Sequence, residues 1–155
     1  MKKALYALLA ITGCFGIGFL GNMLQAKAMV SWYPALDKSW VTPPDSFFPI
    51  GWGIAYICIG VSLAVLIYDD NPARRAYYMS LYAAQLFVQF LWALVFYHFQ
   101  QPLAGLVIGA ALIALIVWYM RKSKEVSVFA SKIYIPYLVW VVFVAYLNFY
   151  IVLKN

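Results

Sequence analysis

Five long apolar runs, from which every charged residue is excluded, constrain this chain more than any other feature of its sequence. The runs cover residues 4–25, 47–68, 76–99, 103–120 and 133–153. The eleven Lys and Arg and the five Asp and Glu residues all lie between or beyond them. Each run is close to the ~20 residues that an α-helix needs to cross the hydrocarbon core of a bilayer. The sequence therefore predicts five membrane-spanning helices, because a helix satisfies its own backbone hydrogen bonds.

The composition supports the same class of protein. Hydrophobic residues make up 66% of the 155 positions and charged residues only 10%, against roughly 25% charged residues in soluble domains. The runs lack the strict alternation of a membrane β-barrel. We predict an all-α integral membrane protein, in which residues 1–155 form a single five-helix bundle and residues 26–46 form a long first loop.

The positive charges indicate an orientation in the membrane. Five spans would place eight Lys and Arg residues on one side and three on the other. The larger set is Lys2, Lys3, Arg74, Arg75, Arg121, Lys122, Lys124 and Lys132, and the smaller is Lys27, Lys38 and Lys154. We expect a cytoplasmic N-terminus and an external C-terminus, in a bacterial cell membrane. The net charge of +6 reflects this topology, and we expect no nucleic-acid partner, because the basic residues lie in short loops.

The first run could also be interpreted as a targeting signal. Residues 11–14 read ITGC and resemble a lipoprotein cleavage box. Apolar sequence continues through Leu20, however, so the run is long enough to span and a span is favoured. Cys14 and Cys58 both lie within spans and belong to no CxxC or Cys/His cluster. The sequence therefore supports neither a disulfide framework nor a metal site.

The first loop is aromatic and rich in proline. Its residues 32–44 read WYPALDKSWVTPP. Trp and Tyr rings suit the headgroup zone of a bilayer, and the three Pro residues remove backbone donors and stiffen the chain. We expect this loop to form a preformed lid.

Three runs carry aromatic and polar residues at helical spacing. These are Trp52, Tyr56 and Gly60 in the second; Gln85, Gln89, Trp92 and Phe96 in the third; and Pro136, Trp140, Val144 and Asn148 in the fifth. Residues at this spacing share one helix face, and amides within a membrane must point inward. We expect the three faces to meet. The two Gln side chains either bond between helices or contact a ligand.

The loop and the three helix faces occur in the same order as the motifs of a known protein family. The first loop is close to the signature WYxxLxKPxWxPP. Further matches are Trp52, Tyr56 and Gly60; Gln85-Leu86 with Gln89 and Trp92; Pro136-Tyr137-Leu138 with Trp140; and Tyr146-Leu147-Asn148. From Gly18 to Asn148 the chain resembles the TspO/MBR family. It departs at Ser39, where the family has Pro, at Gln89, where it has Asn, and at Val144, where it has a smaller residue.

The resemblance implies a five-helix bundle around a cavity that the first loop covers. Family members bind tetrapyrroles such as protoporphyrin IX, benzodiazepine- and isoquinoline-type ligands and, in animals, cholesterol. The residues that it implies as ligand-binding are Trp32, Tyr33, Trp52, Tyr56, Gln89, Phe90, Trp140, Val144 and Leu147. No cofactor is required, and protoporphyrin IX is the expected ligand. Lys27 or Lys38 could pair with a propionate, or could simply be solvated.

Some bacterial members are implicated in light- and oxygen-dependent porphyrin degradation. By family position, Trp52 and Trp140 are the candidate catalytic residues, with Trp32 as a third. No conventional catalytic constellation can be assembled from the sequence, and the sole His, His98, lies near a helix end. The alternative is a passive carrier or scaffold for porphyrin or sterol-like lipids. Residues 147–154 fit a loose sterol-recognition pattern.

The fourth run carries a feature that bears on oligomerisation. Gly105 and Gly109 form a GxxxG motif, with several Ala residues nearby. Such small residues allow close helix approach between two copies or within one bundle. Family members are commonly dimers, so the resemblance implies a homodimer.

Overall fold

The computed structural model describes residues 2–68 and 71–155, and these residues form helices without any strand. The helices are α1 (Lys2–Ser31), α2 (Phe47–Ile67), α3 (Pro72–Ala93), α4 (Pro102–Lys124), α5 (Val128–Lys132) and α6 (Ile135–Lys154). A 3₁₀ turn, η1 (Tyr33–Ala35), follows α1, and a π-helical segment, η2 (Leu94–His98), continues α3.

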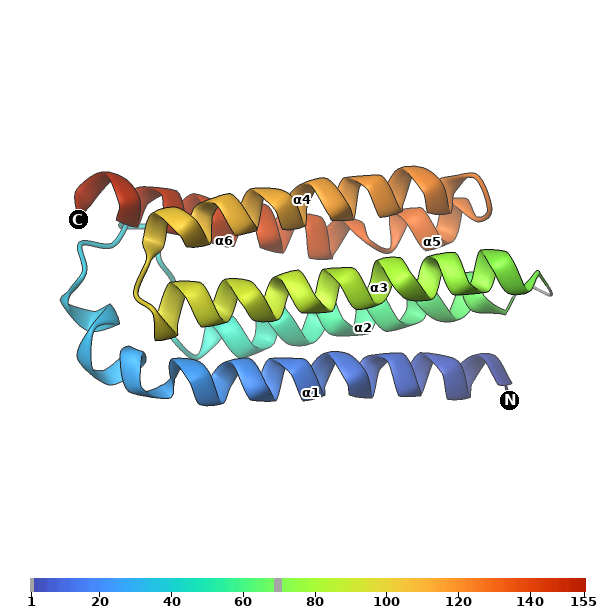
Figure 1. Cartoon of the computed structure of the whole chain (residues 1–155), viewed down its shortest axis with the longest axis horizontal. Coiled ribbons are helices and arrows are strands. Elements are labelled where there is room, and N and C mark those ends of the chain that lie inside the picture. The colour runs from blue at the N-terminus through green and yellow to red at the C-terminus, as the bar shows by residue number, and fades with distance from the viewer. Residues whose placement is uncertain (1, 69–70) are drawn as a thin grey trace.

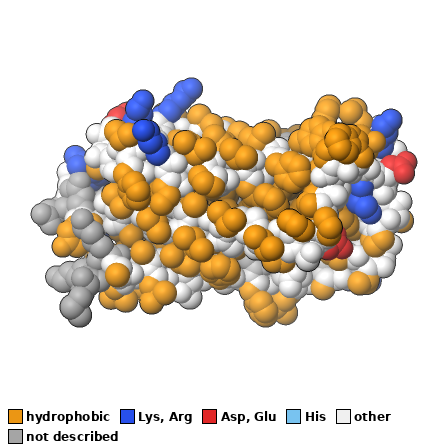
Figure 2. Space-filling view, turned by 180° about the vertical axis from the view of Figure 1, so that it is seen from behind, with side chains coloured by type: hydrophobic (Ala, Val, Ile, Leu, Met, Phe, Trp, Pro, Cys, Tyr) orange, Lys and Arg blue, Asp and Glu red, His pale blue; other side chains and the backbone are white. Residues whose placement is uncertain are grey.

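Five helical stretches are long and apolar enough to cross a membrane. They are Ala4–Ser31, Phe47–Ile67, Pro72–His98, Pro102–Lys124 and Val128–Lys154. The predicted fold class, an all-α bundle with five spans, is confirmed. In Figure 2, the charged side chains visible on that face lie near the two ends of the molecule, and hydrophobic side chains cover the band between them. A bilayer can therefore surround the middle of the bundle.

Several helices extend past the apolar runs from which they were predicted. The first helix continues to Ser31 rather than ending near residue 25. At the start of α3, the Asn71 side chain accepts hydrogen bonds from the backbone N–H groups of Ala73 and Arg74, at 3.0 and 3.2 Å. Long cationic side chains can lie along a helix and reach the polar zone, so the last apolar residue does not mark the last helical one.

The fifth span is broken into α5 and α6. Pro136 has no N–H with which to bond the carbonyl of Lys132, four residues earlier, so a continuous helix is interrupted there. The short helix α5 is capped by Ser127, whose Oγ accepts a hydrogen bond from the Ala130 N–H at 3.2 Å.

The helices run alongside one another, and the two termini lie at opposite ends of the bundle (Figure 1). The first loop lies at the end where α6 finishes, and the end of α2, the start of α3 and the α4–α5 connection lie at the other end. Helix α1 packs on α2, while α4 packs on both α3 and α6. The lid therefore lies at the opposite end of the molecule from the basic start of α3 and the basic end of α4.

Buried tyrosines fill the core toward the end away from the lid. The rings of Tyr119 and Tyr134 stack with centroids 4.2 Å apart. Their hydroxyls reach polar partners: Tyr119 OH lies 3.1 Å from Ser62 Oγ, and Tyr134 OH donates to Gln85 Oε1 at 3.3 Å. Each ring therefore buries a large apolar surface without leaving its hydroxyl unpaired.

The glycines of the GxxxG motif face the interior of the same bundle. A Cβ at Gly105 would lie 3.1 Å from the Asn148 side chain and 3.2 Å from Phe96 Cβ, and one at Gly109 would lie 3.9 Å from Ala145 Cβ. Asn148, with its amide oriented to satisfy its neighbours, bridges the Pro102 carbonyl and the Leu106 N–H of α4, at 3.0 and 2.9 Å. These small residues therefore pack α4 against α6 within one chain.

Candidate ligand-binding cavity

A cavity of about 530 Å³ lies beneath the first loop. Its walls come from α1, from Tyr33 and Asp45 of the first loop, from the first half of α2 and from the α3–η2 segment. The size falls in the range of roughly 300–1,000 Å³ that is typical of small-molecule sites. Helices α4 and α6 contribute none of its described lining residues, so the cavity lies on the α1 side of the bundle.

Aromatic rings form one continuous wall of the cavity. Trp52 stacks on Tyr56 with centroids 5.9 Å apart and an interplanar angle of 28°, and it lies 6.4 Å from Trp92. The wall continues from Trp92 to Tyr97 at 5.8 Å, and from Tyr97 to Tyr33 of the lid at 5.9 Å. Such a surface offers ring faces and edges to a flat aromatic ligand.

Gln89 lies at the inner end of this wall. Its Nε2 donates a hydrogen bond of 2.7 Å to Tyr56 OH on the neighbouring helix, whereas its buried Oε1 has no partner among the described residues. Gln89 and Phe90 line a side pocket of about 60 Å³ that shares Trp52 and Tyr56 with the main cavity. Gln89 thus bonds between helices and still offers an acceptor. Gln85 bonds only within the core.

The three α6 residues expected at the site lie behind the aromatic wall. The Trp140 ring meets Trp52 edge-on at 6.1 Å and occupies space beside Gly51, where a Cβ would be 2.5 Å from the indole. Val144 lines a void of only about 10 Å³ together with Trp52. Leu147 is buried and lines none of the described cavities. The spacing of these residues defined a helix face, but it could not define what separates that face from the cavity.

The lid residues divide into a lining residue and a supporting one. Tyr33 is buried and lines the cavity. Trp32 is half-buried and packs edge-on against Phe96, with centroids 5.5 Å apart, without lining the cavity. Trp40, which the lid also carries, is 91% exposed. The lid therefore covers the cavity with one tyrosine and presents a tryptophan outward.

Contacts within the lid and with the C-terminal part of the chain hold the lid in place. Lys38 Nζ donates to the carbonyls of Tyr33 and Pro34, at 3.0 and 3.3 Å, and lies 4.9 Å from the centre of the Tyr33 ring. The Asn155 side chain bonds both the N–H and the carbonyl of Asp37, at 2.9 and 3.3 Å. Ser39 replaces the Pro of the family signature and is itself buried, with its Oγ 3.5 Å from Tyr146 OH.

The two lysines that were considered as propionate partners do not line the cavity. Of the two candidate lysines, Lys27 is exposed and Lys38 is engaged with the lid, and neither lines the cavity. The charged side chain among the described lining residues is Asp45, and the amides of Asn22 and Gln25 line the same cavity. Burial, helped by the Asp45 carboxylate, raises the pKa of Tyr33 to about 12. The Tyr33 hydroxyl therefore stays neutral at physiological pH and can donate to a ligand.

Several lining residues were absent from the expected site. Trp92 was placed on an inward-facing stripe but not in the site, and Tyr97, Asn22 and Asp45 were not singled out. Asn22 could have been identified from the sequence, because it is a polar residue near the end of the first apolar run. Tyr97 carried none, since its ring reaches the cavity from the π-helical segment η2, and π turns alter the side-chain direction that α-helical spacing implies.

A five-span helical membrane protein, with an aromatic cavity closed by its first loop, is the class that this fold and site define. The chain belongs to the TspO/MBR family, whose model matches residues 10–153. Membership of this family supports a role as a membrane receptor or sensor.

Three relatives illustrate the breadth of the match. The chain is 36% identical over 157 residues to a tryptophan-rich protein TspO of Chlorobaculum tepidum, covering 99% of this chain and 98% of the relative. It is 33% identical over 154 residues to a tryptophan-rich protein TspO of Archaeoglobus fulgidus, covering 94% of each. It is 28% identical over 146 residues to the human translocator protein, covering 88% of this chain and 80% of that one.

Proposed function

We propose that this protein is a membrane receptor or sensor that binds tetrapyrroles such as protoporphyrin IX in the cavity under its lid. The observation that carries the proposal is the unbroken aromatic wall from Tyr56 through Trp52, Trp92 and Tyr97 to Tyr33. A porphyrin is a wide, flat π-system, and stacking on such rings contributes about 0.5–1.5 kcal/mol per pair beyond area burial. The proposal extends to benzodiazepine- and isoquinoline-type ligands, whose aromatic rings can pack on the same wall.

Titration of purified protein with protoporphyrin IX tests this binding. We expect saturable quenching of tryptophan fluorescence, and a weaker apparent affinity in Trp52→Phe, by roughly two- to tenfold if one stacking contact is reduced. Trp118→Phe is the matched control, because Trp118 lies on α4 and bonds Tyr77 of α3, far from the lid. Quenching that does not saturate would rule out the pocket.

Photochemical degradation of the bound porphyrin is a second candidate function. It is favoured by the position of Trp52, whose ring lines the cavity and lies 6.1 Å from that of Trp140. In this proposal the light-excited porphyrin accepts an electron from Trp52, which Trp140 can refill, and passes the electron to molecular oxygen. The superoxide and the tryptophan radical cation that result are the oxidants that attack the porphyrin. Trp32 lies outside the cavity, which makes it the weakest of the three candidates.

Illumination separates this function from that of a passive carrier or scaffold. If the protein promotes degradation, the porphyrin absorption bands should bleach faster in the complex under oxygen than with an unrelated membrane protein, and the excess should disappear under argon. Trp52→Phe should remove more of the excess than Trp32→Phe. Equal bleaching with the unrelated protein supports the carrier instead.

A further inference from the structure

A line of tryptophan and tyrosine rings leads from the cavity under the lid to the other end of the bundle. We call it the aromatic path, and its members, in order, are Trp52, Trp140, Tyr137, Tyr134, Tyr119, Tyr78, Tyr77 and Trp118. It starts at Trp52, which lines the cavity, and finishes at Trp118, near the end of α4. Indole and phenol rings can each give up one electron far more readily than Phe or aliphatic side chains. The path is therefore a row of oxidisable groups.

The first half of the path crosses from α2 into the middle of α6. The rings of Trp52 and Trp140 meet edge-on with centroids 6.1 Å apart. Trp140 and Tyr137 are three residues apart on α6, a spacing that places their Cβ atoms roughly 5–6 Å apart on one helix face. The Tyr134 ring follows Tyr137 at 5.4 Å.

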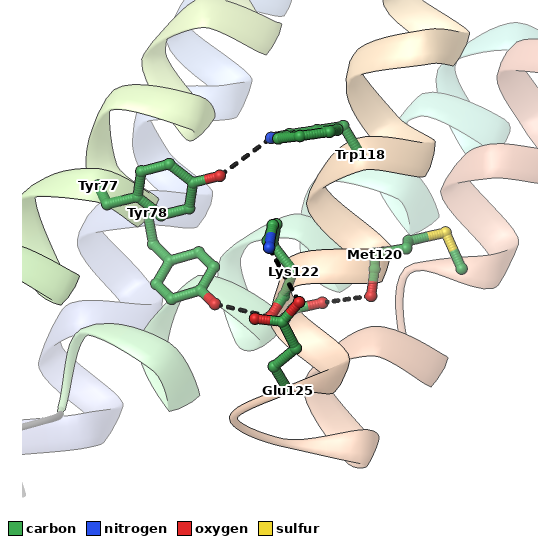
Figure 3. Close-up of polar contacts among 7 residues, drawn as sticks. Tyr77, Tyr78, Trp118, Met120, Lys122 and Glu125 are labelled. Carbon is green, nitrogen blue, oxygen red and sulfur yellow. Dashed lines mark hydrogen bonds and ion pairs between the residues drawn. The ribbon is translucent and has the colours of Figure 1, made fainter.

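The second half of the path reaches the surface. Tyr134 stacks on Tyr119 at 4.2 Å, and Tyr119 meets Tyr78 edge-on at 5.9 Å. The Tyr77 ring follows at 5.3 Å, and Trp118 Nε1 donates a hydrogen bond of 2.9 Å to the Tyr77 hydroxyl (Figure 3). Trp118 is 50% exposed. Because electron tunnelling weakens steeply with distance, short steps between neighbouring rings carry an electron much faster than one jump along the bundle.

Hydrogen bonds provide for the proton of an oxidised tyrosine. Loss of an electron makes the phenol proton strongly acidic, so an acceptor beside the hydroxyl favours oxidation of the ring. Tyr134 OH donates to Gln85 Oε1 at 3.3 Å, and Tyr78 OH donates to the Lys122 carbonyl at 2.8 Å. In each pair the proton can shift toward the acceptor when the ring is oxidised and return when the ring is reduced.

Tyr137 is the member of the path whose hydroxyl makes no described contact. The side chain is fully buried, and its hydroxyl has no hydrogen-bond partner among the described residues. A buried hydroxyl without a partner lowers stability, whereas Phe would keep the ring contact with Tyr134. Packing thus accounts for an aromatic ring at this position but not for a phenol. An oxidisable ring between Trp140 and Tyr134 does account for it.

We propose that the aromatic path carries an oxidising equivalent from Trp52 to Trp118, from one end of the membrane-spanning bundle to the other. Its source rests on the photochemical function proposed above, in which the excited porphyrin takes one electron from Trp52 and passes it to oxygen. Each ring of the path is then oxidised as it reduces the ring before it, until the oxidised group is Trp118.

A water-soluble reductant completes the transfer. Trp118 lies at the level where indoles meet the lipid headgroups, so a one-electron donor of the ascorbate or thiol class can reach it. The donor loses one electron and releases its proton to water, and every ring of the path is restored. The net result is one electron moved from the donor to molecular oxygen, with Trp52 ready for another cycle.

A photo-oxidant attached at the lid end tests the path without porphyrin. Ser46→Cys supplies the attachment site, because Ser46 is exposed and its side chain makes no capping bond to α2, while both native cysteines are buried. A ruthenium polypyridyl complex is coupled to the new thiol and flashed under argon with hexaammineruthenium(III) as the quencher. The oxidant formed in this way cannot diffuse, and no singlet oxygen arises.

The position of the radical is the readout. A nitroso spin trap marks oxidised rings, and mass spectrometry of the digested protein locates the marks. We expect marks at Tyr77 and Trp118 as well as at Trp52. Tyr137→Phe should lower the mark at Trp118 at least severalfold relative to Trp52, because a phenyl ring does not take up the oxidising equivalent. Tyr119→Phe interrupts the path at a second point and should have the same effect.

Tyr150→Phe is the matched control, because Tyr150 lies on the same helix as Tyr137 and its ring belongs to none of the described ring pairs. It should leave the mark at Trp118 unchanged. Equal marking of Trp118 with and without Tyr137→Phe, an equal loss in Tyr150→Phe, or no mark at Trp118 and Tyr77 would overturn the proposal. Thermal unfolding checks that each variant is folded. Since the label replaces the porphyrin, this result stands whether or not protoporphyrin IX binds, and the two proposals fail separately.

Discussion

At the scale of single residues, the hydrogen bond between Gln89 and Tyr56 decides how the aromatic wall is held. It joins α3 to α2 at 2.7 Å in a buried position, directly beside Trp52. Helical spacing indicated that both residues face inward. It could not show that they bond to each other, because that depends on how the two helices are rotated.

Replacing Tyr56 with Phe should destabilise the protein. The change leaves the buried Gln89 amide without its acceptor, which typically costs about 1–3 kcal/mol. Thermal or denaturant unfolding in detergent measures the loss. Tyr150→Phe serves as the control, because the Tyr150 hydroxyl has no hydrogen-bond partner among the described residues; a comparable loss there would refute the explanation.

A second residue-scale prediction concerns Asp45. Its carboxylate lies at the cavity mouth and should repel the propionates of a free porphyrin, so Asp45→Asn should tighten protoporphyrin IX binding by about two- to fivefold at low salt. The neutral dimethyl ester should bind both proteins equally. Titrations of the two ligands side by side provide the measurement, and a tightening seen equally with the ester would remove the charge explanation.

At the scale of elements, the lid shows how far sequence reasoning can reach. Its stiffness was expected from its Pro residues. Its attachment was not: Ser39 contacts Tyr146 of α6, and Asp37 bonds Asn155, the residue that follows α6. A motif describes the residues that a loop contains, whereas its anchoring depends on residues more than a hundred positions away.

Removing the main anchor should speed ligand release. Asn155→Ala deletes two hydrogen bonds to the backbone of Asp37, each worth about 0.5–1.5 kcal/mol net. If the lid must open for release, the dissociation rate of bound porphyrin should rise at least severalfold. Stopped-flow recovery of tryptophan fluorescence measures it. Lys154→Ala, one position earlier, should leave the rate unchanged, and equal rates in the wild type and Asn155→Ala would argue against a closing lid.

The five spans were predictable for a physical reason. Charged residues are excluded from hydrocarbon, so each span can be recognised from its own composition, independently of the other spans. The site, by contrast, depends on how the spans pack against one another. Trp140 shows the limit: its spacing placed it on an inward face, but the missing Cβ of Gly51 lets its ring settle behind Trp52 rather than in the cavity.

At the scale of the whole molecule, two features remain predictions: a homodimer, and a bacterial cell membrane with the N-terminus in the cytoplasm. The interior position of Gly105 and Gly109 means that any dimer must use another surface. Exposed apolar residues on α4, among them Leu103 and Val107, are available to lipid or to a partner.

Gly105→Val tests this distinction. The added side chain would meet Asn148 and Phe96, so the variant should unfold at a lower temperature while the oligomeric state of the folded fraction stays the same. Light scattering in detergent and thermal unfolding provide the two readouts. Dissociation of a dimer without loss of thermal stability would place the GxxxG motif at an interface.

The bond between Asp37 and Asn155 joins positions 118 residues apart in sequence. Contacts of such long separation form late, because most of the chain must first be in place. During synthesis, the aromatic wall of α2 and α3 can assemble long before residue 155 has been added, while the lid still lacks its anchor. A newly made protein would thus pass through an interval in which its cavity is built but open, when a bulky pigment could enter without waiting for the lid to move.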